Sequence, residues 1–174
     1  GRVYNENSTA SSDNMNHRFN MRMEYKIDSN NSILFIPKLS VQANNSNSML
    51  QGNTTTLNVL QSASNNTNHT QINAYNFSDD LLFRHRFNKK GRTLSVTLTT
   101  GINGSDGKND LYASNNYYIK DTATVSVIDQ QSKTAKKGSN IGGNLMYTEP
   151  LSEKSTLTIN YSNTFQFNNS DKKT

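Results

Sequence analysis

Few residues of this chain have types and spacing suited to chemistry, and the first of them lie in the segment GINGSDGKND, residues 101–110. Asp106, Asn109 and Asp110 offer the carboxylate and amide oxygens that Ca²⁺ prefers. The segment lacks the ligand spacing and the terminal glutamate of an EF-hand loop. The pattern therefore favours a flexible surface loop and leaves these residues as a weak calcium candidate.

Other groups used in catalysis or metal binding lack the required arrangement. Asp79 and Asp80 are adjacent, and neighbouring residues of a strand point to opposite faces, which argues against paired acid–base chemistry. His17, His69 and His85 lie far apart in sequence without the spacing of metal ligands. There is no cysteine, so a thiolate site or a disulfide cannot form. The sequence predicts that the protein is not an enzyme and has no cofactor.

Charged residues are the remaining candidates. The chain has a net charge of +5, but its basic residues occur in ones and twos without interleaved aromatics, so nucleic acid is not an expected partner. Charges do recur at alternate positions in two segments, where they would share one face of a strand: Arg22, Glu24 and Lys26, and Arg84 and Arg86. They are candidates to line the interior of a barrel, along a solute path or against a plug. The alternative is the ordinary charge of a water-facing strand.

Strands must position these residues, because apolar and polar residues alternate without a break over residues 14–27, NMNHRFNMRMEYKI. A period of two is typical of a β-strand with two unlike faces. Similar runs occupy residues 32–43, 75–87, 92–100, 139–148 and 157–167. Pro37 lies within the second run and predicts a bulge or an edge, because proline removes one donor from the ladder of hydrogen bonds.

Short segments rich in turn-forming residues pair these runs into hairpins. They are DSNN (28–31), NKKG (88–91), whose Gly91 is suited to a left-handed conformation, and EPLSEK (149–154). Between the hairpins, residues 44–70 and 101–138 are rich in Asn, Ser and Gly and predict two long loops. The less regular extended stretches 54–61 and 117–129 are expected within those loops, as strands that rise above a membrane.

Strand length favours a membrane barrel. From Leu157 to Phe167, ten steps of about 3.3 Å give about 33 Å of strand, which projects to roughly 23 Å at a tilt near 45°. The apolar band of an outer-membrane barrel is about 25 Å tall. Hydrophobic residues make up 32% of the chain, below the roughly 45–50% of globular domains, so a core of normal size is doubtful.

The predicted fold is therefore all-β, an antiparallel up-and-down meander of long hairpins that forms part of a transmembrane β-barrel across residues 1–174. About six spanning strands are too few to close a barrel, for which about eight is the minimum. The chain begins with Gly1 and stops in mid-pattern, which predicts a piece of a longer protein. The candidates for contact with lipid are Met21, Met23, Tyr25, Leu157, Ile159 and Tyr161.

Three segments carry a resemblance to a known family: FRHRFNKKGRTLSVTL, GSDGKNDLY and GGNLMYTEPLSEKSTLTINYS. They resemble the outer-membrane β-barrels related to TonB-dependent receptors that are common in Bacteroidetes, most strongly from Tyr75 to Phe167. The resemblance implies a barrel of roughly 22 strands around an N-terminal plug of the same chain. It also implies the cell outer membrane as location, outer-membrane lipid as surroundings, and nutrient uptake with the TonB machinery and a surface lipoprotein as partners.

A second reading of the same alternation is a secreted β-sandwich that acts as an adhesin or a glycan-binding module. Its aromatic residues would form a core between two packed sheets, and its loops would form a binding rim. Strand length and the burial of the apolar residues distinguish the two readings. A sandwich buries the apolar residues that alternate along its strands, whereas a barrel exposes them to lipid.

Overall fold

A single antiparallel β-sheet contains nearly all of the chain. The computed structural model describes residues 1–119 and 122–174. Its strands are β1 (Arg2–Asn20), β2 (Met23–Lys26), β3 (Asn31–Thr56), β4 (Val59–Arg86), β5 (Thr93–Ile119), β6 (Thr122–Ser152) and β7 (Ser155–Lys173). They form a 7-stranded sheet in the order β1-β3-β4-β5-β6-β7, with β2 paired to β3. The predicted all-β up-and-down meander is confirmed, and the sheet is open, with β1 and β7 at its edges.

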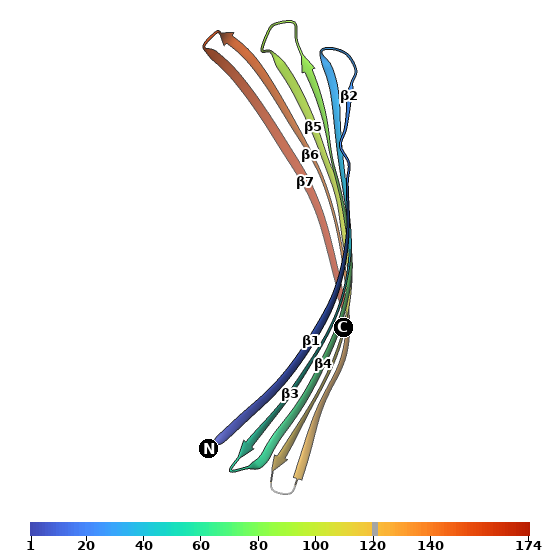
Figure 1. Cartoon of the computed structure of the whole chain (residues 1–174), viewed down its shortest axis with the longest axis vertical. Coiled ribbons are helices and arrows are strands. Elements are labelled where there is room, and N and C mark those ends of the chain that lie inside the picture. Colours follow the sequence, from blue (N-terminus) through green and yellow to red (C-terminus); the bar gives the residue numbers. More distant parts are fainter. Residues whose placement is uncertain (120–121) are drawn as a thin grey trace.

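The sheet is one curved layer (Figure 1). One end, called here the proximal end, carries the turn between β2 and β3 and the turn between β4 and β5; the distal end carries the turn between β3 and β4. Of the hydrophobic residues that the structure describes, Leu34 and Ala113 alone are buried. The described residues therefore form no second sheet and no dry interior of the kind that a β-sandwich requires.

Two of the three predicted proximal turns, at residues 28–31 and 88–91, form as the sequence predicts. The turn predicted over residues 149–154 is confined to residues 153–154, because β6 continues to Ser152 and β7 begins at Ser155. The Asp28 carboxylate accepts hydrogen bonds from the backbone N–H groups of Asn30 and Asn31, both at 2.7 Å, and from the Asn31 side-chain amide at 2.7 Å. These bonds, with that of the Asn31 side chain the largest, hold the pKa of Asp28 below its ordinary value. Gly91 adopts a φ of 86°, the left-handed conformation expected in the turn between β4 and β5.

The prediction of two long loops over residues 44–70 and 101–138 is wrong. Residues 44–56 continue β3, 59–70 belong to β4, and β5 and β6 extend to Ile119 and from Thr122. Residues 120–121, within the extended stretch expected at 117–129, lie outside the described residues.

Pairing between strands explains why these turn-forming residues are extended. Side-chain hydrogen bonds join neighbouring strands along the segments that were predicted to be loops, from Asn5 to Asn53 at 3.3 Å and from Thr70 to Asn109 at 2.7 Å. Asn, Ser and Thr prefer turns locally, but the cross-strand partners supplied by the sheet override that preference. The strands consequently run well beyond the length that crosses a membrane.

The distal turn between β3 and β4 contains two consecutive left-handed residues, Leu57 (φ 51°) and Asn58 (φ 63°). Two such residues match the type I′ turn, which favours the sequence Asn-Gly. We expect the double substitution L57N/N58G to stabilise the folded protein by about 1 kcal/mol, because it relieves the left-handed strain of leucine. Urea unfolding in detergent measures this change, and a lower unfolding midpoint in the double variant would refute the turn geometry.

The unbroken strand expected over residues 14–27 is also corrected, since Met21 and Arg22 separate β1 from β2. Met21 lies opposite Pro37 and donates its backbone N–H to the Pro37 carbonyl at 3.0 Å. Pro37 has no N–H to return, so the ladder to the edge strand is interrupted at this point. The bulge or edge expected at Pro37 is therefore wrong: β3 is an interior strand whose register to β4 is unbroken at Pro37, and the proline interrupts only the pairing toward β1 and β2.

Candidate functional site

One face of the sheet carries a continuous apolar region near the proximal end. Residues that lie directly opposite each other on paired strands point to the same face, and the registers therefore fix the membership of this region. We call it the apolar band: Met15, Phe19, Met21, Met23, Tyr25, Ile33, Phe35, Pro37, Leu39, Val41, Ala43, Tyr75, Phe77, Leu81, Phe83, Leu94, Val96, Leu98, Ile102, Ile141, Leu145, Tyr147, Leu157, Ile159, Tyr161, Phe165 and Phe167.

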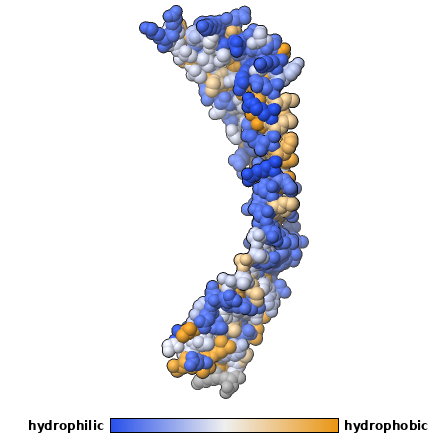
Figure 2. Space-filling view, in the orientation of Figure 1, coloured by the Kyte–Doolittle hydropathy of each residue, from blue (hydrophilic) through white to orange (hydrophobic). Residues whose placement is uncertain are grey.

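The apolar band is open to its surroundings. Met23 and Ile159 are each 51% exposed and Tyr161 is 63% exposed. All the residues predicted to contact lipid belong to the band and are exposed: Met21, Met23, Tyr25, Leu157, Ile159 and Tyr161. Figure 2 shows apolar residues along the convex edge of the proximal half and hydrophilic residues along the opposite edge. An exposed apolar surface of this extent marks a surface of contact with a membrane or with another protein.

The band crosses the hydrogen-bonded rows of the sheet obliquely. Phe167 is its most distal residue on β7, and its row passes through Ser139, Ile102 and Phe77 to Leu39 on β3. On β3 the band continues from Leu39 to Ala43, four residues further. The distal margin of the band is thus displaced by four residues between β3 and β7.

The proximal margin is displaced in the same direction. The row of Ile159 passes through Tyr147, Leu94 and His85 to Asn31 on β3, two residues before the band begins at Ile33. On β7 the band extends two residues further, to Leu157. Both margins therefore shift by four residues in total.

This displacement gives an angle between the strands and the band. β3 and β7 are four steps apart in the strand order, so the band shifts by one residue per strand. One residue is about 3.3 Å along a strand and neighbouring strands are about 4.8 Å apart, which gives an angle of about 35°. Strands of outer-membrane barrels tilt by about 35–45°. At 35°, the ten steps of the band on β7, about 33 Å, project to about 27 Å, close to the roughly 25 Å of such barrels.

Within the described part of this face, the level of the band contains the carboxylate of Asp79, which accepts a hydrogen bond from the Thr100 hydroxyl, and, at the proximal margin opposite Leu157, that of Glu149. His17 lies among apolar neighbours, opposite Val41. His85 lies at the proximal margin, where its Nδ1 is 2.7 Å from the Asn31 side-chain oxygen. The remaining polar or small residues at this level are Ser139, Gly143 and Asn163.

The opposite face, called here the polar face, carries the predicted lumen-lining residues Arg22, Glu24, Lys26, Arg84 and Arg86. Arg22 and Glu24 are 3.8 Å apart. At the level of the apolar band, this face carries three further charged residues that the sequence reasoning did not name as candidates for the lumen: Arg18, Lys38 and Asp80. The latter two form an ion pair at 3.7 Å. Parity along the chain gives no sign of that pair, because it joins two strands.

A charged and aromatic network covers the proximal margin of the band. Glu149, whose side chain is 16% exposed, accepts hydrogen bonds from Lys89 at 2.6 Å, from Arg92 at 2.6 and 2.9 Å, and from the Tyr147 hydroxyl at 2.6 Å. Phe87 packs edge to face against Tyr147, with centroids 6.2 Å apart. The network ties the turn between β4 and β5 to the end of β6. The sequence reasoning missed this shared carboxylate.

Hydrogen bonds from Arg92, then from Lys89 and Tyr147, hold the pKa of Glu149 well below its ordinary value. A carboxylate with a depressed pKa in the folded state stabilises that state above its unfolded pKa, near 4.3, and loses this contribution as the pH falls through the folded value. We expect E149Q to unfold a few degrees lower than the wild type at pH 7, with the difference shrinking steadily below pH 4. Thermal unfolding from pH 2 to 8 measures this; a difference independent of pH would contradict the network.

The calcium candidates are dispersed by the strand geometry. Asp106 and Asp110 point to the face that carries the apolar band, at positions distal to the band. Asn109 points to the polar face and accepts a hydrogen bond from the Thr70 hydroxyl. The Asp110 carboxylate accepts a hydrogen bond from the Gln131 side-chain amide at 2.7 Å and lies 3.0 Å from the Lys108 ammonium group. These contacts lower the pKa of Asp110. Across residues 1–119 and 122–174 there is no group of three or more metal-ligating His, Asp or Glu residues.

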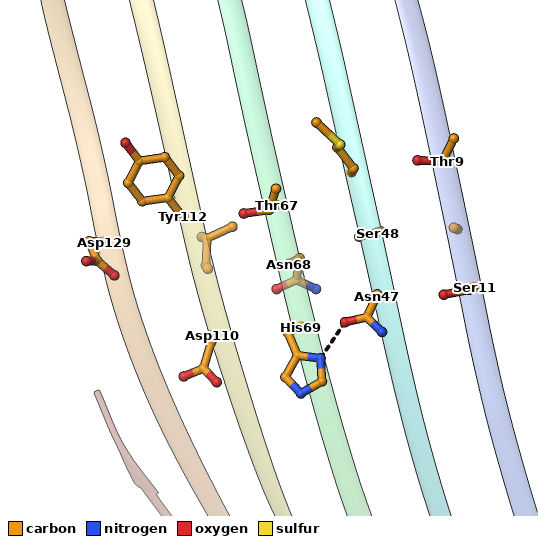
Figure 3. A pocket seen from close by; sticks show the side chains of 13 residues that line it. Thr9, Ser11, Asn47, Ser48, Thr67, Asn68, His69, Asp110, Tyr112 and Asp129 are labelled. Carbon is orange, nitrogen blue, oxygen red and sulfur yellow. Dashed lines mark hydrogen bonds between the residues drawn. The ribbon is translucent and has the colours of Figure 1, made fainter.

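A shallow hollow of about 440 Å³ lies beside Asp110 on the same face (Figure 3). Its labelled side chains come from β1, β3, β4, β5 and β6, and His69 Nδ1 lies 2.5 Å from the Asn47 side-chain oxygen. The lining is mostly amide and hydroxyl groups, which suits a surface in water. It provides no nucleophile paired with a base.

Within residues 1–119 and 122–174, no helix is long and apolar enough to cross a membrane. No protein-family model matches the chain. No curated protein is significantly similar to it.

Proposed function

We propose that the chain forms part of the barrel wall of an outer-membrane transporter that resembles TonB-dependent receptors and takes up a nutrient. The apolar band contacts outer-membrane lipid, and the polar face lines the lumen. The two open edges pair with further strands of the same protein, because the sheet has too few strands to close on itself. A plug domain of the same chain fills the lumen, and the TonB machinery and a surface lipoprotein are the protein partners.

The oblique course of the apolar band is the observation that carries this proposal. A flat lipid layer cuts tilted strands at a register that shifts steadily from one strand to the next. The shift of one residue per strand between β3 and β7 supports a tilt of about 35°. An apolar stripe that packed against a second sheet would have no reason to follow that tilt.

The lengths of the strands also support the proposal. β4 has 28 residues and β6 has 31, whereas a membrane strand needs about 9–11. The proximal part of each strand carries the band, and the distal part has polar residues on both faces. The distal part therefore extends the wall into water beyond the membrane, where a solute first meets the protein.

Fractionation of the full-length protein tests the proposal. We expect it to sediment with outer membranes and to show heat-modifiable migration on gels, as folded barrels do. A strain lacking the gene should lose uptake of the cognate nutrient and regain it on complementation. Recovery of the protein in the periplasm or the medium would contradict the membrane assignment, and normal uptake in the deletion strain would contradict the transport role.

A further inference from the structure

The polar face is divided into a charged region and an uncharged region at the level of the apolar band. Basic residues are confined to β1–β4: Arg18, Arg22, Lys26, Lys38, Arg84 and Arg86. We call this set the cationic strip. In the same rows, β5, β6 and β7 present hydroxyl and amide groups, such as Thr97, Asn144 and Asn160.

Most of the charge of the cationic strip is not neutralised within the described part of the chain. Arg22 and Lys38 have acidic partners, at 3.8 and 3.7 Å. Lys26, Arg84 and Arg86 have no acidic group within ion-pair distance among the residues the structure describes.

These unneutralised residues surround one hollow. Lys26 and Arg84 lie in one row, on either side of Ser32, and Arg86 lies two positions further along β4. They line a hollow of about 610 Å³ together with the hydroxyl groups of Ser32, Thr93 and Ser95. Two carboxylates, those of Asp28 and Glu24, also border the hollow. The oxygens of Asp28 are held by the turn that it caps, and Glu24 lies 3.8 Å from Arg22, so the basic groups of the hollow still outnumber its free carboxylates. Two guanidinium groups and an ammonium group beside hydroxyl donors provide many hydrogen-bond donors to an oxyanion.

From this arrangement we infer that the cationic strip binds anionic groups, either carboxylate, sulfate or phosphate, of the solute that passes along the polar face. The uncharged amide and hydroxyl groups of β5–β7 contact the neutral polar part of the same solute. Charge of one sign along a low-dielectric wall concentrates anions there and speeds their entry. This inference rests on the proposed function in one respect: it takes the polar face to be the lumen.

Citrate is a suitable probe for the strip, with glucose as an uncharged control. Equilibrium dialysis of the full-length protein in detergent should detect citrate binding that weakens as salt is raised, and no glucose binding of similar strength. The double variant R84Q/R86Q should raise the citrate Kd by at least about tenfold, since each replacement removes charge-assisted hydrogen bonds. The matched control K136Q/K172Q removes the same charge from the distal part of the polar face and should change the Kd less than about twofold.

The inference is overturned if the wild type does not bind citrate, or if both double variants weaken binding equally. It is also overturned if R84Q/R86Q leaves the Kd unchanged but makes another part of the protein protease-sensitive, because the strip then holds protein carboxylates. If R84Q/R86Q loses heat-modifiable migration, K26Q replaces it, with an expected increase in Kd of about threefold. Loss of citrate binding leaves lipid contact of the apolar band intact, whereas citrate binding by a protein found outside membranes would refute the proposed function alone.

Discussion

Replacing Leu98 with arginine lowers the free energy of unfolding by about 2–4 kcal/mol in a lipid bilayer. Leu98 lies midway along the apolar band on β5, in the row of Leu81 and Gly143. At that depth, the arginine side chain would have no water and no acidic neighbour in its row. Urea unfolding in lipid vesicles, followed by heat-modifiable migration, measures the loss.

The matched control is T97R, one residue away on the polar face. Thr97 pairs with Leu82 and Asn144, and its side chain faces the region that we assign to the lumen. An arginine there stays in water, so the unfolding free energy should change by less than about 0.5 kcal/mol. Equal losses in L98R and T97R would mean that both faces are buried, and a larger loss in T97R would reverse the assignment of the faces.

Replacing Gly104 with alanine lowers the free energy of unfolding by about 1–3 kcal/mol through overpacking. Gly104 on β5 lies opposite Tyr75, whose ring covers it at the distal margin of the apolar band. A Cβ atom at position 104 would lie 2.7 Å from Cε1 of the Tyr75 ring, so the ring must leave its place. The same unfolding assay measures the loss, and the fluorescence of the displaced tyrosine should change with it.

Gly107 provides the matched control, because it lies on the same strand and receives the same substitution. A Cβ atom there would have its nearest neighbours at 3.9 Å, which is ordinary contact. G107A should therefore stabilise the protein slightly, by about 0.5–1 kcal/mol, since alanine loses less conformational freedom on folding than glycine does. If G104A proved as stable as G107A, the ring of Tyr75 would not cover Gly104 in solution.

The proximal half of the fold was predictable from sequence because two local signals agree there. Strict alternation, as over residues 157–167, identifies the strands and their faces. Asp28 and Gly91 then fix the turns through chemistry that depends on near neighbours alone. Along each of β3, β5 and β7, the residues that these signals assign to the apolar face all point to the one face of the sheet that carries the apolar band.

The distal half was not predictable, because its residues favour turns when considered alone. Asn, Ser and Thr become extended over residues 44–56 and 59–70 by pairing with strands far away in sequence, for example Asn5 with Asn53. The loop expected around the calcium candidates was wrong for the same reason: once residues 101–110 are a strand, Asn109 must point away from Asp106 and Asp110.

The candidate site was predictable in its faces but not in its geometry. The spacing of Arg84 and Arg86 places them together, but their proximity to Lys26 depends on a register that spans three strands. The oblique course of the apolar band likewise appears only when the rows from β3 to β7 are aligned. The Glu149 network depends on contacts between separate hairpins, and local sequence patterns do not indicate such contacts.

The most direct test of the account is a series of single cysteines along residues 94–99, in a chain that has no cysteine of its own. In the membrane-embedded full-length protein, cysteines at Ser95, Thr97 and Thr99 should react with a water-soluble maleimide. Those at Leu94, Val96 and Leu98 should not react, and fluorophores placed there should be quenched by brominated lipid. Equal reactivity at both parities, or quenching at Thr97 and not at Leu98, would contradict the claim that one face meets lipid and the other an aqueous lumen.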